Sequence, residues 1–176
     1  MADQHLVDAA RLLRRYHDLV SGFVAPPDAR WRLVAPTRAE LICHNDWAPW
    51  NVVFRDGRVA VMLDWDMAGP GTRVWDLANA AYSWVPLYPR SAPRFTLERQ
   101  SARLRQFLDA YGFENRVAIL PTINDRLLFI ADFFLEQSAK DEPGFQKLID
   151  WDVPGRLRRD AAELERNGDV FARALA

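Results

Sequence analysis

The sequence has little cysteine, little lysine and no long apolar run. The single cysteine, Cys43, excludes an internal disulfide and is typical of a reducing compartment. No stretch approaches the ~20 apolar residues of a membrane-spanning helix. The first twenty residues lack the apolar segment of a secretory signal. We therefore expect a cytoplasmic protein that does not associate with membranes.

The charge balance also excludes a class of partner. The net charge is −1, and only Lys140 and Lys147 are lysines among the 23 basic residues. Such a chain has no bulk electrostatic attraction to nucleic acid. Its 176 residues, of which 49% are hydrophobic, suffice for one globular domain spanning residues 1–176.

Hydrophobic periodicity predicts a mostly helical α+β chain with one small hairpin. Two β-branched runs flank Asp56-Gly57, which is a strong hairpin signal. Gly112 is a candidate helix C-cap, and Gly168 is where the last helix can be interrupted. A short strand is expected at 39–43, and helices at 4–20, 74–84, 97–111, 124–138 and 157–175. The segment 124–138 is apolar nearly all round, which indicates burial on most sides.

Polar residues that could bind a metal or take part in catalysis surround this hairpin. The sequence reads His44-x-Asp46-x-x-x-x-Asn51, and Asp64 follows the second β-branched run. Because Asn51 opens the hairpin and Asp64 closes it, we expect the two side chains to lie side by side. Amide and carboxylate oxygens suit Mg²⁺. Asp46, on the preceding loop, could then accept a proton from a hydroxyl group that approaches the same ion.

This pattern resembles the catalytic loop and metal-binding segment of aminoglycoside phosphotransferases and choline kinases, distant relatives of protein kinases. The resemblance runs from about Leu41 to Ala78, and the LLRRYH of the opening helix is similar to the helix that precedes this loop. It implies a protein-kinase-like C-terminal lobe whose hairpin carries the catalytic and metal loops. It also implies Mg²⁺ and ATP or GTP as cofactors, and a small-molecule acceptor.

The resemblance gives each polar residue a role. Asp46 would be the catalytic base, and His44 would support it by bracing the loop. Asn51 and Asp64 would bind the metal and, through it, the nucleotide. Asp76, on the following helix, would hold the loop through backbone hydrogen bonds.

One part of the family pattern is missing. Kinases of this type hold the nucleotide phosphates with a Gly-rich loop and a strand lysine from a first lobe. The 43 residues before His44 contain neither, and Gly69-Pro70-Gly71 lies after the metal motif. We therefore expect the N-terminal nucleotide lobe to be absent. The apolar surface left exposed would be covered by a second copy, as a dimer or larger, or by a partner.

Three functions remain open. The favoured one is a metal-dependent phosphotransferase. The second is a catalytically silent relative that gives resistance or immunity by sequestering a ligand or partner. The third is a metal-dependent hydrolase that uses Asp46, Asp64 and Asp66 as a carboxylate cluster. Whether the chain is an enzyme therefore stays open, with phosphoryl transfer preferred.

Several residues near the motif have two interpretations. Asp66 could be a third metal ligand, but we favour a turn cap. Cys43 could be a nucleophile with His44 as its base, but strand neighbours point to opposite faces, so we favour a buried apolar role. His5 and His17 are expected to be helix-surface or packing residues.

Two larger sets also have two interpretations each. Acidic residues near the C-terminus could attract a cationic acceptor such as an aminoglycoside, or form a solvated helix face, which we favour. Aromatic residues around the motif are expected to pack in the core, although one could line a pocket. The acids are Asp141, Glu142, Asp150 and Asp152, and the aromatic residues are Trp47, Trp50, Trp65 and Trp75.

Overall fold

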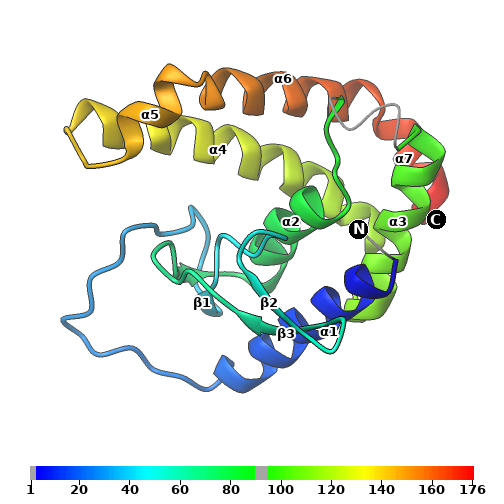
Figure 1. Cartoon of the computed structure of the whole chain (residues 1–176), viewed down its shortest axis with the longest axis horizontal. Coiled ribbons are helices and arrows are strands. Elements are labelled where there is room, and N and C mark those ends of the chain that lie inside the picture. The colour runs from blue at the N-terminus through cyan, green and yellow to red at the C-terminus, as the bar shows by residue number, and fades with distance from the viewer. Residues whose placement is uncertain (1–2, 90–94) are drawn as a thin grey trace.

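The computed structural model describes residues 3–89 and 95–176, in which helices pack around two small antiparallel sheets (Figure 1). The helices are α1 Asp3–Val20, α2 Arg73–Trp84, α3 Leu97–Tyr111, α4 Ile119–Ala139, α5 Phe145–Asp150, α6 Val153–Arg166 and α7 Gly168–Leu175, with a 3₁₀ turn at Arg116–Ala118. The strands are β1 Leu41–Cys43, β2 Val52–Arg55, β3 Arg58–Met62 and β4 Gly69–Gly71. The mostly helical α+β class is confirmed.

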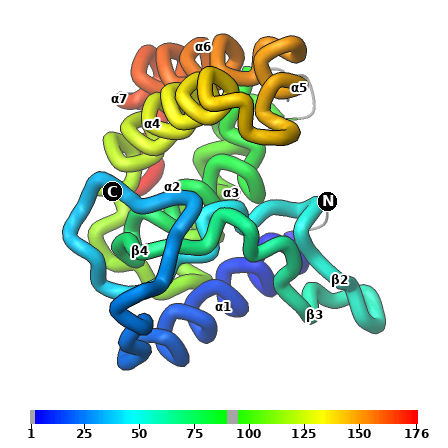
Figure 2. Tube along the Cα trace, turned by 90° about the vertical axis from the view of Figure 1, so that its left-hand side faces the viewer, coloured from blue at the N-terminus to red at the C-terminus, as the bar shows by residue number. Residues whose placement is uncertain are grey.

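The main core lies where α1, α2 and α3 meet. Leu6 and Leu13 of α1 are fully buried, as the helical spacing of the first twenty residues predicts. They share this core with Phe107 of α3. Helix α3 ends at Gly112, whose left-handed backbone (φ 81°) makes it the predicted C-cap. Figure 2 shows α1 on the opposite side of the molecule from α4 and α6.

The predicted hairpin is formed by β2 and β3. Its turn residues Asp56 and Gly57 both have positive φ, as a tight two-residue hairpin loop requires. The pairing continues beyond the strands, because the Asn51 carbonyl accepts a hydrogen bond from the Leu63 N–H at 3.0 Å. Asp64 therefore follows directly after the residue that pairs with Asn51.

The Gly69-Pro70-Gly71 segment forms a strand that the sequence did not predict. It is β4, and it pairs antiparallel with β1, with Leu41 opposite Gly71. A Cβ at Gly69 would lie 1.9 Å from the Leu33 carbonyl oxygen, and one at Gly71 would lie 2.8 Å from the Cys43 sulfur. The glycines are therefore required by close contacts between segments.

Helices α4, α5 and α6 form a second layer above the sheets (Figure 2). The expectation that 124–138 is buried on most sides is wrong, because Leu128 and Leu135 are exposed on α4. Helix α5 was not predicted, and its six residues are too few to show a period. The predicted interruption of the last helix is present, since α6 ends at Arg166 and α7 begins at Gly168.

None of the helices within residues 3–89 and 95–176 combines the length and the apolar character of a membrane span.

Candidate active site

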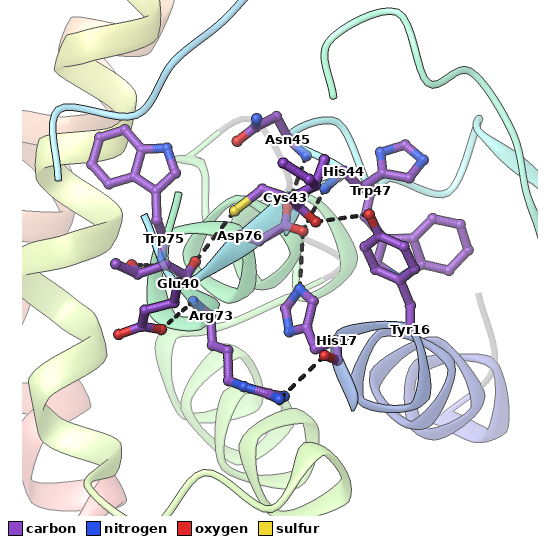
Figure 3. A network of polar contacts seen from close by, with 12 residues as sticks. Tyr16, His17, Glu40, Cys43, His44, Asn45, Trp47, Arg73, Trp75 and Asp76 are labelled. Atoms are coloured by element: carbon purple, nitrogen blue, oxygen red, sulfur yellow. Dashed lines mark hydrogen bonds and ion pairs between the residues drawn. The ribbon is translucent and has the colours of Figure 1, made fainter. Parts of the chain in front are cut away.

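Asp76 connects the loop before the hairpin to α2. The Thr72 side chain caps α2 by accepting a hydrogen bond from the Trp75 N–H, which places Asp76 in the first helical turn. Asp76 is fully buried, and its two oxygens accept hydrogen bonds from the backbone N–H groups of His44 (2.7 Å) and Asn45 (2.8 Å) (Figure 3). One carboxylate therefore sets the backbone conformation of this loop.

His17 of α1 supports Asp76 from the other side. Its Nε2 donates to Asp76 Oδ2 at 3.0 Å, because a carboxylate only accepts, and its Nδ1 lies 2.7 Å from the Tyr111 hydroxyl. Burial raises the pKa of Asp76, but its hydrogen bonds with His17 and His44 outweigh burial, so that the pKa is lowered. Asp76 is held as a carboxylate, and it ties three segments together.

The ring of His44 joins the loop to the end of the hairpin. Its Nδ1 accepts the Asp46 N–H at 3.2 Å, so Nε2 is the protonated nitrogen and donates to the Leu63 carbonyl at 3.0 Å. Burial lowers the pKa of His44, in agreement with this neutral form. The Trp65 ring packs on it with centroids 4.4 Å apart. His44 thus acts as a spacer between the segments of Asp46 and Asp64.

Asp46 lies at the end of this chain of contacts. Its Oδ2 accepts a hydrogen bond from the Asn51 amide at 2.7 Å, and the same amide donates to the Asp46 carbonyl at 2.8 Å. Burial raises the pKa of Asp46 to about 6, against the lowering effects of Asn51 and Arg126, and the charge of Asp64 contributes to the rise. Asp46 is thus a half-buried carboxylate whose pKa is raised toward neutrality.

Asn51 and Asp64 have the chemistry of a magnesium site. The Asn51 amide nitrogen donates to Asp46, so Oδ1 is the atom of this side chain that could bind a cation. Asp64 is exposed and has a left-handed backbone (φ 62°), which departs from the regular alternation of a strand. An amide oxygen and a free carboxylate are hard donors of the kind that Mg²⁺ takes together with phosphate and water. The donor set therefore fits Mg²⁺.

A cavity of about 520 Å³ separates the loop and hairpin end from α4, α5 and α6. Asp46, Asp64 and Asp66 lie in its wall together with Arg32, Arg126 and Arg156. Much of the remaining wall is apolar, contributed by Met67, Ile123, Leu127, Ile130, Phe134, Phe145, Leu148 and Leu157. The size is that of a pocket for a small molecule.

The structure shows which of the residues considered from the sequence lie at this cavity. Trp50 is exposed and lines it, while Trp47 and Trp75 are buried. The acids Asp141, Glu142, Asp150 and Asp152 are exposed, and none of them lines the cavity. Cys43 is buried with its thiol donating to the Thr72 carbonyl at 3.4 Å, and burial raises the pKa of that thiol. Its environment opposes formation of a nucleophilic thiolate.

The carboxylate cluster of the hydrolase hypothesis is not formed. Within residues 3–89 and 95–176, no three His, Cys, Asp or Glu side chains come together as a metal-binding group. Asp66 lies in the turn closed by the hydrogen bond from the Ala68 N–H to the Trp65 carbonyl. The hydrolase hypothesis therefore lacks its metal-binding group.

Two residues of the site were missed at the sequence level. His17 was expected to be a packing or surface residue, and nothing local marks it as a partner of Asp76. Arg126 is buried in the cavity wall, and its Nη2 donates to the Asn45 carbonyl at 2.8 Å. The sequence contained a signal for the burial of Arg126. Ile123, Arg126 and Ile130 lie at helical spacing, which places the arginine on the apolar face of α4.

Comparison with known proteins gives one informative relative. The chain is 33% identical, over 113 residues, to the trifolitoxin immunity protein of Rhizobium leguminosarum bv. trifolii. The matched region is 60% of this chain and 43% of that protein, so the chain spans less than half the length of its relative. No solved structure matches.

A family match covers the first part of the chain. The pattern of the phosphotransferase enzyme family (APH) matches residues 4–118, which is more than half of the chain and contains α1, the loop, the hairpin and Asp76. The protein belongs to the phosphotransferase enzyme family.

Proposed function

We propose that the chain forms the acceptor and metal half of a phosphoryl-transfer site, in a protein-kinase-like C-terminal lobe. The acceptor is a small molecule bound in the cavity, and the donor is ATP or GTP with Mg²⁺. Family membership and the pairing of Asp46 with Asn51 support this function. So does the position of Asp64, which shares the cavity wall with Asp46.

The observation that carries the proposal is the convergence of two segments on one point. The Asn51–Leu63 backbone pair and the His44–Leu63 hydrogen bond draw the loop and the hairpin end together. In phosphoryl transfer, catalysis consists of positioning and charge stabilisation. Asp46 would orient the acceptor hydroxyl and receive its proton. Asn51 and Asp64 would hold Mg²⁺, which when bound neutralises charge on the nucleotide phosphates.

Binding of Mg²⁺ and nucleotide should raise the melting temperature of the protein. A ligand at a hundred times its dissociation constant stabilises the folded state by about 2.7 kcal/mol, and one at its dissociation constant by about 0.4 kcal/mol. We expect a shift on the order of 1–10 °C with millimolar Mg²⁺ and ATP or GTP, depending on how far the nucleotide saturates the site. Asp64→Asn should abolish it, because the substitution removes the charge on the metal ligand. Differential scanning fluorimetry measures the shift.

The control is Asp56→Asn on the same hairpin. Asp56 also has a left-handed backbone (φ 51°) but lies in the turn at the opposite end of β3 from Asp64. Asparagine tolerates this conformation, so neither variant introduces strain. The Asp56 variant should keep the full shift. A nucleotide shift that survives Asp64→Asn, or no shift in the wild type at millimolar nucleotide, would remove the proposal.

A second function is favoured by the name of the relative. A trifolitoxin immunity protein is 33% identical over the matched region, so immunity by sequestering a toxic molecule in the same cavity is the alternative. The two functions differ in their need for Asp46. Transfer requires its carboxylate, whereas sequestration requires only the cavity.

We further propose that a second copy or a partner covers the hairpin. Exposed apolar side chains on its strands and directly after β3 support this, because apolar residues exposed together on one element are typical of an interaction surface. They are Val53, Phe54, Val61 and Leu63.

A further inference from the structure

Three of the side chains that have buried polar atoms without hydrogen-bond partners line the cavity. Among the described residues, these atoms include Nε and Nη1 of Arg126, Nδ2 of Asn79 and Oδ1 of Asn45. All three side chains line the one cavity next to Asp46. Buried polar groups are normally paired, so unpaired groups on side chains of a cavity wall are available to a bound molecule. Donors predominate in this group.

Arg126 has two unpaired hydrogen-bond donors, more than Asn45 or Asn79. Only 2% of the residue is exposed, and its Nη2 donates to the Asn45 carbonyl. The guanidinium carbon lies 5.3 Å from the centroid of the Trp75 ring, which fixes its plane without supplying a hydrogen-bond acceptor. The Nη2 group and one face of the guanidinium are thus in contact with the protein, and the Nε and Nη1 groups remain unpaired. A buried cation in this state gains free energy from a bound anion.

The orientation of Asn45 is set independently. Its Nδ2 donates to the Met67 carbonyl at 3.1 Å, which identifies Oδ1 as the unpaired atom. The cavity therefore offers donors from Arg126 and Asn79 and an acceptor from Asn45. A ligand that carries an oxyanion and a hydroxyl group would satisfy both kinds of atom.

We propose that the cavity binds a small hydroxylated carboxylic acid, whose carboxylate is held by the Arg126 guanidinium and the Asn79 amide. This rests on the proposed function only in naming that molecule as the phosphoryl acceptor. The binding itself requires neither nucleotide nor metal. The assignment replaces the cationic acceptor considered from the sequence with an anionic one.

A carboxylate fits better than a phosphate for reasons of charge and shape. The planar fork of a guanidinium matches the two oxygens of a carboxylate. Asp46 and Asp76 already interact electrostatically with Arg126, so one added negative charge is tolerated better than two. The apolar wall at Ile123 and Leu127 suits a small hydrocarbon body.

Calorimetric titration with matched probes tests the proposal. The probes are lactate, mandelate and para-hydroxyphenylacetate, each compared with its own primary amide, in the absence of nucleotide. At least one carboxylate should bind more than about tenfold tighter than its amide, because a charge-assisted pair is lost in the amide. Arg126→Met should abolish this preference. Asn79→Leu, which preserves the side-chain shape, should weaken it.

The variants separate binding from folding. Arg126→Met removes unpaired buried donors and retains the apolar stem, so we expect it to fold. If it does not, Asn79→Leu carries the test. Arg103→Met is the control, because Arg103 is equally buried but does not line the cavity. It should leave the preference intact.

The proposal is overturned if no probe binds at 10 mM, if the amides bind as tightly as the acids, or if both cavity variants keep the preference. Its failure is distinct from failure of the proposed function. Carboxylate binding is titrated without nucleotide or Mg²⁺, and the nucleotide shift is measured without the carboxylate, so each proposal has its own readout. A nucleotide shift without carboxylate binding would retain the phosphotransferase site and reject only this acceptor.

Discussion

Replacing Asp76 by alanine is expected to lower the free energy of unfolding by about 3–5 kcal/mol. The substitution removes the acceptor for three buried donors, which are the backbone N–H groups of His44 and Asn45 and the Nε2–H of His17. Each unpaired donor costs its own desolvation free energy, and none can reach water. Equilibrium unfolding in urea, followed by tryptophan fluorescence, measures the difference.

The matched control is Asp18→Ala. Asp18 also accepts from arginines, at 2.8 Å from Arg14 and 2.9 Å from Arg73, but nearly half of its side chain is exposed. Exposed ion pairs contribute about 0–1 kcal/mol, so this variant should be close to wild type. A loss below about 1 kcal/mol for Asp76→Ala would contradict the anchoring role.

The same anchor gives a pH dependence of known sign. The pKa of Asp76 is lower in the folded chain than in the unfolded chain. Its contribution to stability is therefore complete above the ordinary carboxyl pKa and is lost as the pH falls through the folded value. Asp76→Ala should flatten this acidic part of the stability profile.

Asp46→Asn is expected to lower the rate of phosphoryl transfer by about 10²–10⁴-fold, because the general base is lost. Stability should not fall with it. Burial raises the pKa of Asp46 to about 6, so at neutral pH the ionised carboxylate costs folding free energy. Release of the nucleotide γ-phosphate to acceptor or water measures the rate, and urea unfolding measures the stability.

Nucleotide binding provides the control for this variant. The Mg²⁺ and ATP shift should persist in Asp46→Asn, because Asn51 and Asp64 remain. A transfer rate equal to wild type would exclude Asp46 as the base. The variant also separates the two candidate functions, because transfer requires the Asp46 carboxylate whereas sequestration requires only the cavity.

Asp46 and Asp76 differ in their electrostatic environment. Asp46 belongs to the loop and Asp76 accepts hydrogen bonds from it, but their pKa values move in opposite directions. Asp76 is surrounded by donors and stays ionised as a structural anchor. Asp46 has one amide donor and is destabilised as an anion. Environments that separate the pKa values of neighbouring acids are typical of catalytic sites.

Local chemistry explains what the sequence could predict. Asp56-Gly57 requires positive φ, Gly112 ends a helix, and the apolar spacing of α1 has one period. Each of these signals is contained within a short segment, so the hairpin and most helices could be predicted from them. The hairpin in turn predicted that Asn51 and Asp64 would be neighbours.

The remaining features depend on contacts between distant segments. Gly69 and Gly71 are typical turn residues, and only the nearby Leu33 carbonyl and Cys43 sulfur explain their place in a strand. His17 acquires its role from Asp76, which is 59 residues away in sequence. No local pattern encodes such a pair. Arg126 was detectable only as a charge on an apolar helix face.

Manganese relaxation provides the most direct test of the central claim, which is that Asn51 and Asp64 hold one cation beside Asp46. In an amide NMR spectrum with substoichiometric Mn²⁺, the resonances of Asp46, Asn51 and Asp64 should broaden first, while those of α7 remain sharp. Asp64→Asn should suppress the broadening. Broadening confined to the exposed acids between Asp141 and Asp152, or none at millimolar Mn²⁺, would contradict the claim.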